Sequence, residues 1–308
     1  MSTDFFNRIR TKMSFLLYPL ATDEQVKAFL HYTETAYKVD QKLPFAEHRA
    51  EYEAYSFELL KSLTLRQMNK ISADYEIYVR QQGAKAAAAR LLKEQIMPLL
   101  RKFTRQKTIG YHGLEHTELV ALRAVDVALS LGHERQSELV PVLLAAAIHD
   151  CARTDDGFNT HHGRDAANMP EVRTFLDNPI FNLTTEQKKR IRYAAYNHTT
   201  AQPNDGVAYD YITKSLCDGD RIRLSWERGH SSKFFFTPKG DELGSMNPYR
   251  AIDYLHDWDN LMQQNGIRPL YGKLAGKYQI GYTSHTGPKR ALFVPPEYRT
   301  GRGNQRSY

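Results

Sequence analysis

The feature that most constrains the fold is an uninterrupted run of ten apolar residues, Leu139 to Ile148. Because the run is apolar on every side, it predicts a central, buried helix from about Ser137 to Ile148, with Pro141 tolerated in the first turn. Its length is about half of the roughly 20 residues needed to cross a bilayer, so we expect no membrane span. His149 and Asp150 follow directly at the end of this helix.

Two further helices are expected to direct a histidine inward. Between residues 114 and 131, apolar residues recur with helical spacing after His116, which places this side chain at the start of the inward face. Thr184 and Gln187 have the spacing of a capping box, and the helix they predict carries an apolar stripe that leads to His198. Both histidines are therefore expected to face the interior.

A fourth helix is predicted from about Tyr209 to Leu224, with Ile212 on its inward face. At about 100° per residue, Asp220 lies about 80° from Ile212, whereas Asp218 lies about 240° away. Asp220 is therefore the better candidate for an inward carboxylate.

The remaining segments complete the expected architecture. Strong helix formers dominate from Asp23 to about Phe103 without strand-like alternation, which predicts helices there. After Gly229 the chain becomes rich in Gly, Pro and Tyr, and short strands or irregular structure packed on the helices are expected. The predicted fold class is mainly α, with an N-terminal helical region (1–107), a helical bundle (108–230) and a loop-rich C-terminal extension (231–308).

Inward histidines and carboxylates are expected from separate helices or from the loops that follow them. They are His116, His149, Asp150, His162, His198 and Asp220. A buried carboxylate among imidazoles is destabilising without a cation, and hard or borderline divalent metals bind both kinds of ligand. The series therefore predicts a metal site.

Four segments of this region carry motifs: YHGLEHTELV, AAAIHDCARTDDG, HHGRDAA and CDGDRIR. The first, second and fourth resemble the first histidine motif, the HD motif and the closing aspartate motif of the HD superfamily of metal-dependent phosphohydrolases. The third is similar to a segment that some members carry between the HD pair and the next histidine. The resemblance covers residues 108–227 and implies that the bundle is a helical HD domain.

This resemblance implies a divalent metal cofactor, which would be Mn, Mg, Fe, Co or Ni, bound as one or two ions. Its core ligands would be His116, His149, Asp150 and Asp220. His162 and His198 would match the additional ligands of members that hold two metals. His161 remains an alternative to His162.

The implied activity is metal-dependent hydrolysis of a phosphomonoester or phosphodiester, such as a nucleotide, with Asp150 bridging the metals. Arg153, Arg164 and Arg221 each lie within a few residues of an expected ligand. A guanidinium neutralises phosphate charge well, so these arginines are candidates for contacts with the substrate.

His112 precedes His116 by one helical turn. The pattern YH-x-x-x-H resembles the cyclic-nucleotide phosphodiesterase version of the fold, which implies that His112 protonates the leaving oxygen. The alternative is a hydrogen bond from His112 that orients His116 or Asp220.

A second His–Asp pair occurs at His256 and Asp257. It follows no long buried helix and lacks a partner histidine upstream at the family spacing. We therefore do not expect this pair to bind a metal.

Two other functions are compatible with the same residues. Some HD-fold proteins are di-iron oxygenases, and a set of histidines and carboxylates does not distinguish iron from manganese or magnesium. A catalytically silent HD domain could serve as an adaptor or RNA-binding module, although the intact ligand series argues against this. HGLEHT is also similar to the opening of the phosphodiesterase domains of SidE-type bacterial effectors, but those domains do not rely on an HD pair.

Basic residues outnumber acidic ones by 42 to 35, which gives a net charge of +7. This excess favours an anionic partner, such as a phosphate-containing substrate. The tail from His285 to Tyr308 contains Arg299, Arg302 and Arg306, and it either contacts the phosphates of a substrate or nucleic acid or is simply solvated.

Two cysteines, Cys151 and Cys217, are too few for a disulfide framework and are expected to be reduced and buried. The first 20 residues mix Asp4 and three basic residues into an apolar stretch and show no small-residue cleavage site. No secretory signal is expected from this pattern, and we predict a cytoplasmic protein.

Overall fold

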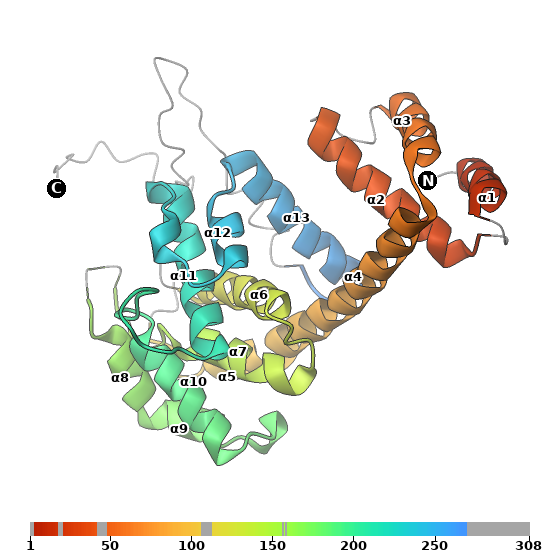
Figure 1. Ribbon diagram of the computed structural model, residues 1–308. Helices are drawn as coiled ribbons and strands as arrows, with labels where there is room; N and C mark the ends of the chain where they lie inside the picture. Colours follow the sequence, from red (N-terminus) through yellow and green to blue (C-terminus); the bar gives the residue numbers. More distant parts are fainter. Residues whose placement is uncertain are drawn as a thin grey trace, which may run out of the picture. The chain divides into compact units, whose positions relative to one another are not determined.

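The computed structural model describes residues 3–17, 21–41, 48–105, 113–155, 157 and 159–269. This part of the chain is helical and contains no β-strand (Figure 1), which confirms the predicted mainly α class. Two compact units divide the chain after Gln82, inside helix α4 (Leu65–Leu91). No helix in the described ranges has both the length and the apolar character of a membrane span.

The first unit contains three helices and the beginning of α4. The three are α1 (Thr3–Leu17), α2 (Asp23–Gln41) and α3 (Arg49–Ser62). Phe5, Tyr37 and Tyr52 are buried between them, and the Tyr52 hydroxyl donates a hydrogen bond of 3.0 Å to the Leu30 carbonyl. Aromatic side chains therefore supply much of the core of this unit.

The second unit contains the end of α4 and all the later elements. These are a π-helical turn (Leu92–Ile96), α5 (Met97–Leu100), α6 (Leu114–Ser130), α7 (Gln136–Ile148), α8 (His162–Asn168), α9 (Pro170–Leu176), a 3-10 turn (Pro179–Phe181), α10 (Thr185–Asn197), α11 (Tyr211–Arg228), a 3-10 turn (Ser232–Phe234), α12 (Pro238–Gly244) and α13 (Pro248–Gln264). Helix α7 packs against α6, α10 and α11 (Figure 1). Every residue from Leu139 to Ile148 is buried, as predicted for a central helix.

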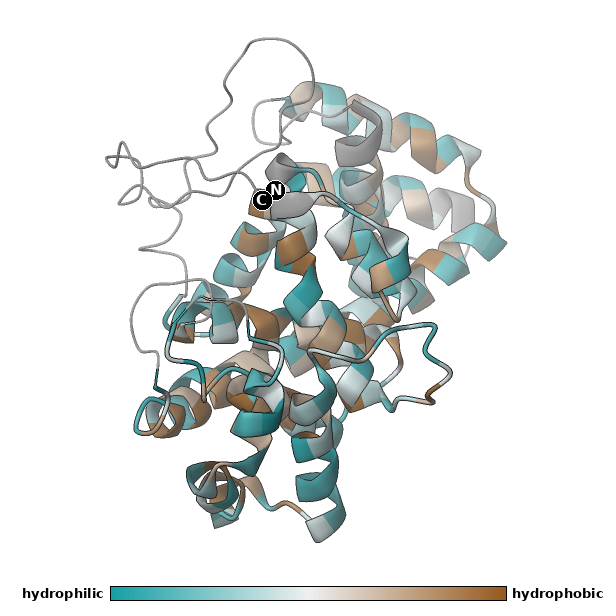
Figure 2. Cartoon of the chain, turned by 90° about the vertical axis from the view of Figure 1, so that its left-hand side faces the viewer, coloured by the Kyte–Doolittle hydropathy of each residue, from teal (hydrophilic) through white to brown (hydrophobic). Residues whose placement is uncertain are grey.

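Most other helices are amphipathic. Apolar and polar bands alternate along their ribbons in Figure 2, as expected when one side of a helix faces a core and the other faces solvent. The α10 helix begins with the predicted capping box, in which Thr184 accepts a hydrogen bond from the Gln187 N–H. The helix bounds expected from periodicity are therefore close to those observed.

Pro141 lies in the second turn of α7, not in the first turn as expected, because the helix begins at Gln136. Proline has no N–H for the carbonyl four residues earlier, which belongs to Ser137. The Gln187 side-chain amide donates a hydrogen bond of 3.3 Å to that Ser137 carbonyl. Gln187 of α10 thus provides the hydrogen bond that the Ser137 carbonyl lacks because of Pro141.

The segment after Gly229 is helical in its described part, so the expected short strands are wrong there. Thr237 and Asn247 cap the N-termini of α12 and α13 with their side chains, and each is followed by a proline in the first turn. A proline at this position favours the start of a helix, because its absent N–H would have no helical partner. The prolines therefore mark helix starts, whereas the composition had suggested loops.

A buried carboxylate holds α13 to the rest of the second unit. Asp126 of α6 accepts hydrogen bonds from the Tyr254 hydroxyl (2.6 Å) and the Trp258 indole N–H (2.9 Å). The Lys85 ammonium lies 2.7 Å from the same carboxylate and 4.5 Å from the centre of the Trp258 ring. These contacts explain why the described part of the C-terminal region belongs to the compact unit of the bundle.

Helices α6 and α11 approach closely at Gly219. A Cβ atom at this position would lie 2.9 Å from both the Ala124 nitrogen and the Val120 carbonyl oxygen. The backbone of α6 cannot move away without disturbing the packing of α7, so the glycine is required for this contact.

Gly219→Ala is expected to lower the free energy of unfolding by about 1–3 kcal/mol, the usual cost of overpacking a core. Gly83→Ala is the matched control, because Gly83 is also helical but a Cβ atom added to it would have no neighbouring atom within 4 Å. This control should be neutral or stabilising by up to about 1 kcal/mol. Thermal unfolding followed by circular dichroism measures both, and equal stability of the two variants would contradict the close-approach argument.

Candidate metal centre

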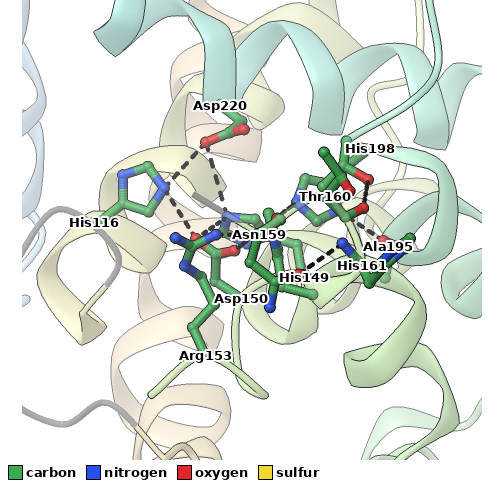
Figure 3. Close-up of polar contacts among 12 residues, drawn as sticks. His116, His149, Asp150, Arg153, Asn159, Thr160, His161, Ala195, His198 and Asp220 are labelled. Atoms are coloured by element: carbon green, nitrogen blue, oxygen red, sulfur yellow. Dashed lines mark hydrogen bonds and ion pairs between the residues drawn. The ribbon is translucent and has the colours of Figure 1, made fainter. Parts of the chain in front are cut away.

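The six side chains predicted as metal ligands lie together in the second unit. Figure 3 labels five of them: His116, His149, Asp150, His198 and Asp220. His116 is in the first turn of α6, and Asp220 is in α11. The other four lie at helix ends: His149 and Asp150 after α7, His162 at the start of α8 and His198 after α10. These helix ends lie close together because α6, α10 and α11 pack against α7, and α8 packs against α10.

The two carboxylate oxygens of Asp150 face different imidazoles. Oδ2 lies 3.2 Å from His149 Nε2 and 3.6 Å from His116 Nε2. Oδ1 lies 3.0 Å from His162 Nε2 and 3.9 Å from His198 Nε2. The carboxylate therefore stands between two sets of nitrogen donors.

Asp220 completes the first of these sets. Its Oδ1 lies 3.0 Å from His116 Nε2 and 3.8 Å from His149 Nε2. Asp218 faces another way and accepts hydrogen bonds from the Thr237 hydroxyl (2.7 Å) and the Phe236 N–H (2.8 Å). The structure thus brings Asp220, and not Asp218, into the cluster.

The spacing of the donor atoms fits a bound metal ion. A metal with bonds of about 2.1 Å holds neighbouring ligand atoms about 3.0 Å apart in octahedral geometry and about 3.4 Å apart in tetrahedral geometry. The contacts around Asp150 and Asp220 run from 3.0 to 3.9 Å, so the shorter ones match these separations, and the atoms of each candidate group lie within 4.8 Å of one another. The buried cluster can therefore hold a metal ion.

Two of the imidazoles are oriented by the backbone. His149 Nδ1 lies 2.7 Å from the Ala146 carbonyl, and His198 Nδ1 lies 2.7 Å from the Ala195 carbonyl. A carbonyl oxygen only accepts, so each Nδ1 carries a proton and donates it. Both Nε2 atoms then point into the cluster, as is usual for histidines that bind metals.

Burial and neighbouring charges give three histidines of the cluster different pKa values. Burial disfavours the charge of His149, but the nearby carboxylates of Asp150 and Asp220 outweigh it and raise the pKa of His149 to about 9. Burial lowers the pKa of His116 to about 4, and burial together with the charge of His149 lowers that of His198 to about 3. Burial works against ionisation of Asp220, but its contacts with His116 and His149 hold its pKa well below the usual range. His149 is therefore the imidazole of the three that is protonated on both ring nitrogens, and so positively charged, at neutral pH.

Both cysteines beside the cluster are free and buried, as predicted. Burial raises the pKa of Cys151 and of Cys217 to about 12. A thiol must lose its proton to bind a metal, so neither cysteine is suited to be a ligand here.

Among the neighbouring histidines, the structure separates His161 from His162. His161 is exposed, and its backbone N–H donates to the Asn159 side chain at 2.8 Å. His162 is buried and reaches Asp150. The His256–Asp257 pair lies outside the cluster, exposed on α13.

The three arginines proposed for substrate contacts differ in position. Arg153 is buried and lies beside His162, with its NH1 atom 2.8 Å from His162 Nδ1. Arg221 donates to the carbonyls of Phe234 and Ala201. Arg164 is exposed and pairs with the adjacent Asp165, outside the cluster.

Two predictions from the sequence lie outside the described residues. They are the role of His112 and the phosphate contacts of the basic tail from His285 to Tyr308.

The site also requires Gly163, which the search for histidines and carboxylates in the sequence did not identify. A Cβ at this position would lie 2.5 Å from the Ala195 carbonyl oxygen and 2.8 Å from the His198 ring. Glycine therefore lets α8 approach the end of α10 so that His162 and His198 meet. The signal was present in HHGRDAA, where the glycine follows His162.

Comparisons of the chain with models of known protein families, with curated proteins and with solved structures found no match. The chemistry of the cluster therefore follows from its own donor atoms, spacing and burial. Imidazoles and carboxylates in one buried group form a donor set suited to a divalent cation.

Binding of Mn²⁺ at pH 7–8 is expected to release about one proton. The raised pKa of His149 keeps this imidazole protonated between its ordinary value of 6.5 and about 9, and its Nε2 must lose the proton to bind a metal. The apparent affinity should therefore rise by about tenfold per pH unit up to about pH 9. Calorimetric titration in two buffers of different ionisation enthalpy measures the release, and identical heats in both buffers would contradict it.

Proposed function

We propose that this chain is an HD-type, metal-dependent phosphohydrolase that acts on a phosphomonoester or phosphodiester of the nucleotide kind. The observation that supports this most directly is the buried Asp150 carboxylate, whose two oxygens lie nearest to different imidazoles. A bridging carboxylate of this kind suits a site for one or two divalent ions. The motifs that resemble those of the HD superfamily contain these same residues.

The proposed ligands fall into two groups that share Asp150. His116, His149, Asp150 and Asp220 would hold one ion. Asp150, His162 and His198 offer a second position, although His198 also lies in one group with His149 and Asp220. The ion would be Mn, Mg, Fe, Co or Ni, and it would lower the pKa of a bound water and hold a phosphoryl oxygen.

The protein's own groups would orient the reaction. Asp220 has 22% of its side chain exposed, whereas His149 and Asp150 have at most 2%, so the substrate phosphate approaches from the side of Asp220. Hydrolysis forms a bond from the water oxygen to phosphorus and breaks the bond to the leaving oxygen, which takes up a proton. The sequence-based candidate for this proton donor is His112.

Asp150→Ala is expected to reduce hydrolysis by at least about 100-fold, because even groups that only contact metal ligands usually contribute 10–100-fold. The matched control is Asp257→Ala, since Asp257 also follows a histidine but is exposed on α13. The assay compares Mn²⁺-loaded proteins on nitrophenyl phosphomonoesters, nitrophenyl phosphodiesters and nucleotides. Circular dichroism checks that both variants remain helical.

Three results would contradict the proposal. Greater loss of activity in Asp257→Ala than in Asp150→Ala would place the site on α13. Turnover that requires oxygen would favour the di-iron oxygenase alternative, since hydrolysis proceeds without it. Metal binding without turnover of any phosphoester in the panel would favour an adaptor or RNA-binding module.

A further inference from the structure

His162 differs from the other imidazoles in what its Nδ1 atom contacts. This atom makes a short contact with the Asn159 carbonyl and also lies 2.8 Å from the NH1 atom of Arg153. A carbonyl oxygen requires a proton on Nδ1, whereas a guanidinium requires a lone pair there. A neutral imidazole cannot satisfy both partners at once, so one of them decides where the proton of His162 resides.

Arg153 is held independently of His162. Its Nε donates to the Asp155 carbonyl at 3.3 Å, and its NH2 atom donates to the Gly157 carbonyl at 2.5 Å. Only 5% of the residue is exposed, and a guanidinium remains protonated in proteins. The imidazole, and not the arginine, must therefore adapt to this contact.

The proton of His162 then has a defined place. When Nδ1 accepts from Arg153, the proton of the neutral ring is on Nε2, which lies 3.0 Å from Asp150 Oδ1. In this form His162 donates a hydrogen bond of 2.9 Å through Nε2 to His198 Nε2, beside the Asp150 carboxylate, and has no lone pair for a metal. His198, which donates through Nδ1 to the Ala195 carbonyl, has the opposite form.

We infer that Arg153 is a positioning residue that sets the tautomer of His162 and thereby weakens the second metal position. The inference rests on the proposed metal-dependent function. The first position is expected to bind the tighter ion, because it offers four ligands against three and because His149 keeps its Nδ1 bond to the Ala146 carbonyl when Nε2 binds the ion. For an ion to bind at the second position, His162 must lose the proton on Nε2 and carry one on Nδ1 instead. The Nδ1–H group then donates to the Asn159 carbonyl. The contact with Arg153 is lost in this step.

The role inferred for Arg153 is tested by calorimetric titration of the metal-free full chain with Mn²⁺. The wild type should bind one ion tightly and a second weakly. Arg153→Met removes the donors and the charge, and should tighten the second Kd by about 10- to 100-fold, the usual range for groups that contact metal ligands. The first Kd should change little. Arg153→Lys restores a cationic donor and should return the second Kd toward the wild-type value.

His162→Gln is the control for the site of the second ion. Combined with Arg153→Met, it should abolish the gain in affinity, since the gain depends on the freed Nε2. An unchanged or weaker second Kd in Arg153→Met contradicts the inference, and so does a gain that survives the loss of His162. A wild type that binds no metal would instead contradict the proposed function.

A second measurement requires no change to Arg153 and no metal. Long-range ¹H–¹⁵N spectra of the histidine rings distinguish the two tautomers, and His162→Gln assigns the signals. In the metal-free wild type, His162 should carry its proton on Nε2, while His198 should carry its proton on Nδ1. Identical tautomers of the two rings would overturn the inference, whatever the metal stoichiometry.

Discussion

The buried carboxylate of Asp150 is the constraint on which the rest of the site depends. It is 2% exposed and is surrounded by the rings of four histidines, so its charge is removed from water. Such a group is stable only when the surrounding atoms supply positive charge or proton donors. The raised pKa of His149 is one answer to this requirement, and a bound cation is the stronger one.

Imidazoles at the ends of helices surround the Asp150 carboxylate. An imidazole at the end of a helix can donate Nδ1–H to a carbonyl of the last turn, as His149 and His198 do with Ala146 and Ala195. This bond satisfies a carbonyl that has no helical partner and fixes the direction of Nε2. The helix ends must also pack closely. Gly163 allows this, because it has no Cβ atom that would collide with the end of α10. The same backbone features thus stabilise the helix ends and orient the donor atoms.

Several parts of this arrangement could be predicted because they are local. The all-apolar run before His149 predicted a central helix, and the capping box at Thr184 predicted the start of α10. The 100° turn per residue separated Asp220 from Asp218 before any contact was known. The described part of the segment after Gly229 was predicted wrongly, since composition suggested loops and strands whereas caps and the Asp126 contacts stabilise α12 and α13. The domain limits at 107 and 230 stay predictions.

By itself, then, the sequence determined the mainly α class and the inward positions of His116, His198 and Asp220, because helical periodicity and capping depend on residues within a few positions of one another. It left His161 and His162 as alternatives. Only the tertiary structure decided which atoms meet. That Asp150 divides its two oxygens between two sets of imidazoles, and that Arg153 contacts His162 while Arg221 bonds to the carbonyls of Phe234 and Ala201, depends on where separate segments pack. Contacts at hydrogen-bond distance leave no periodic trace in the chain, since they are fixed by the packing of whole helices.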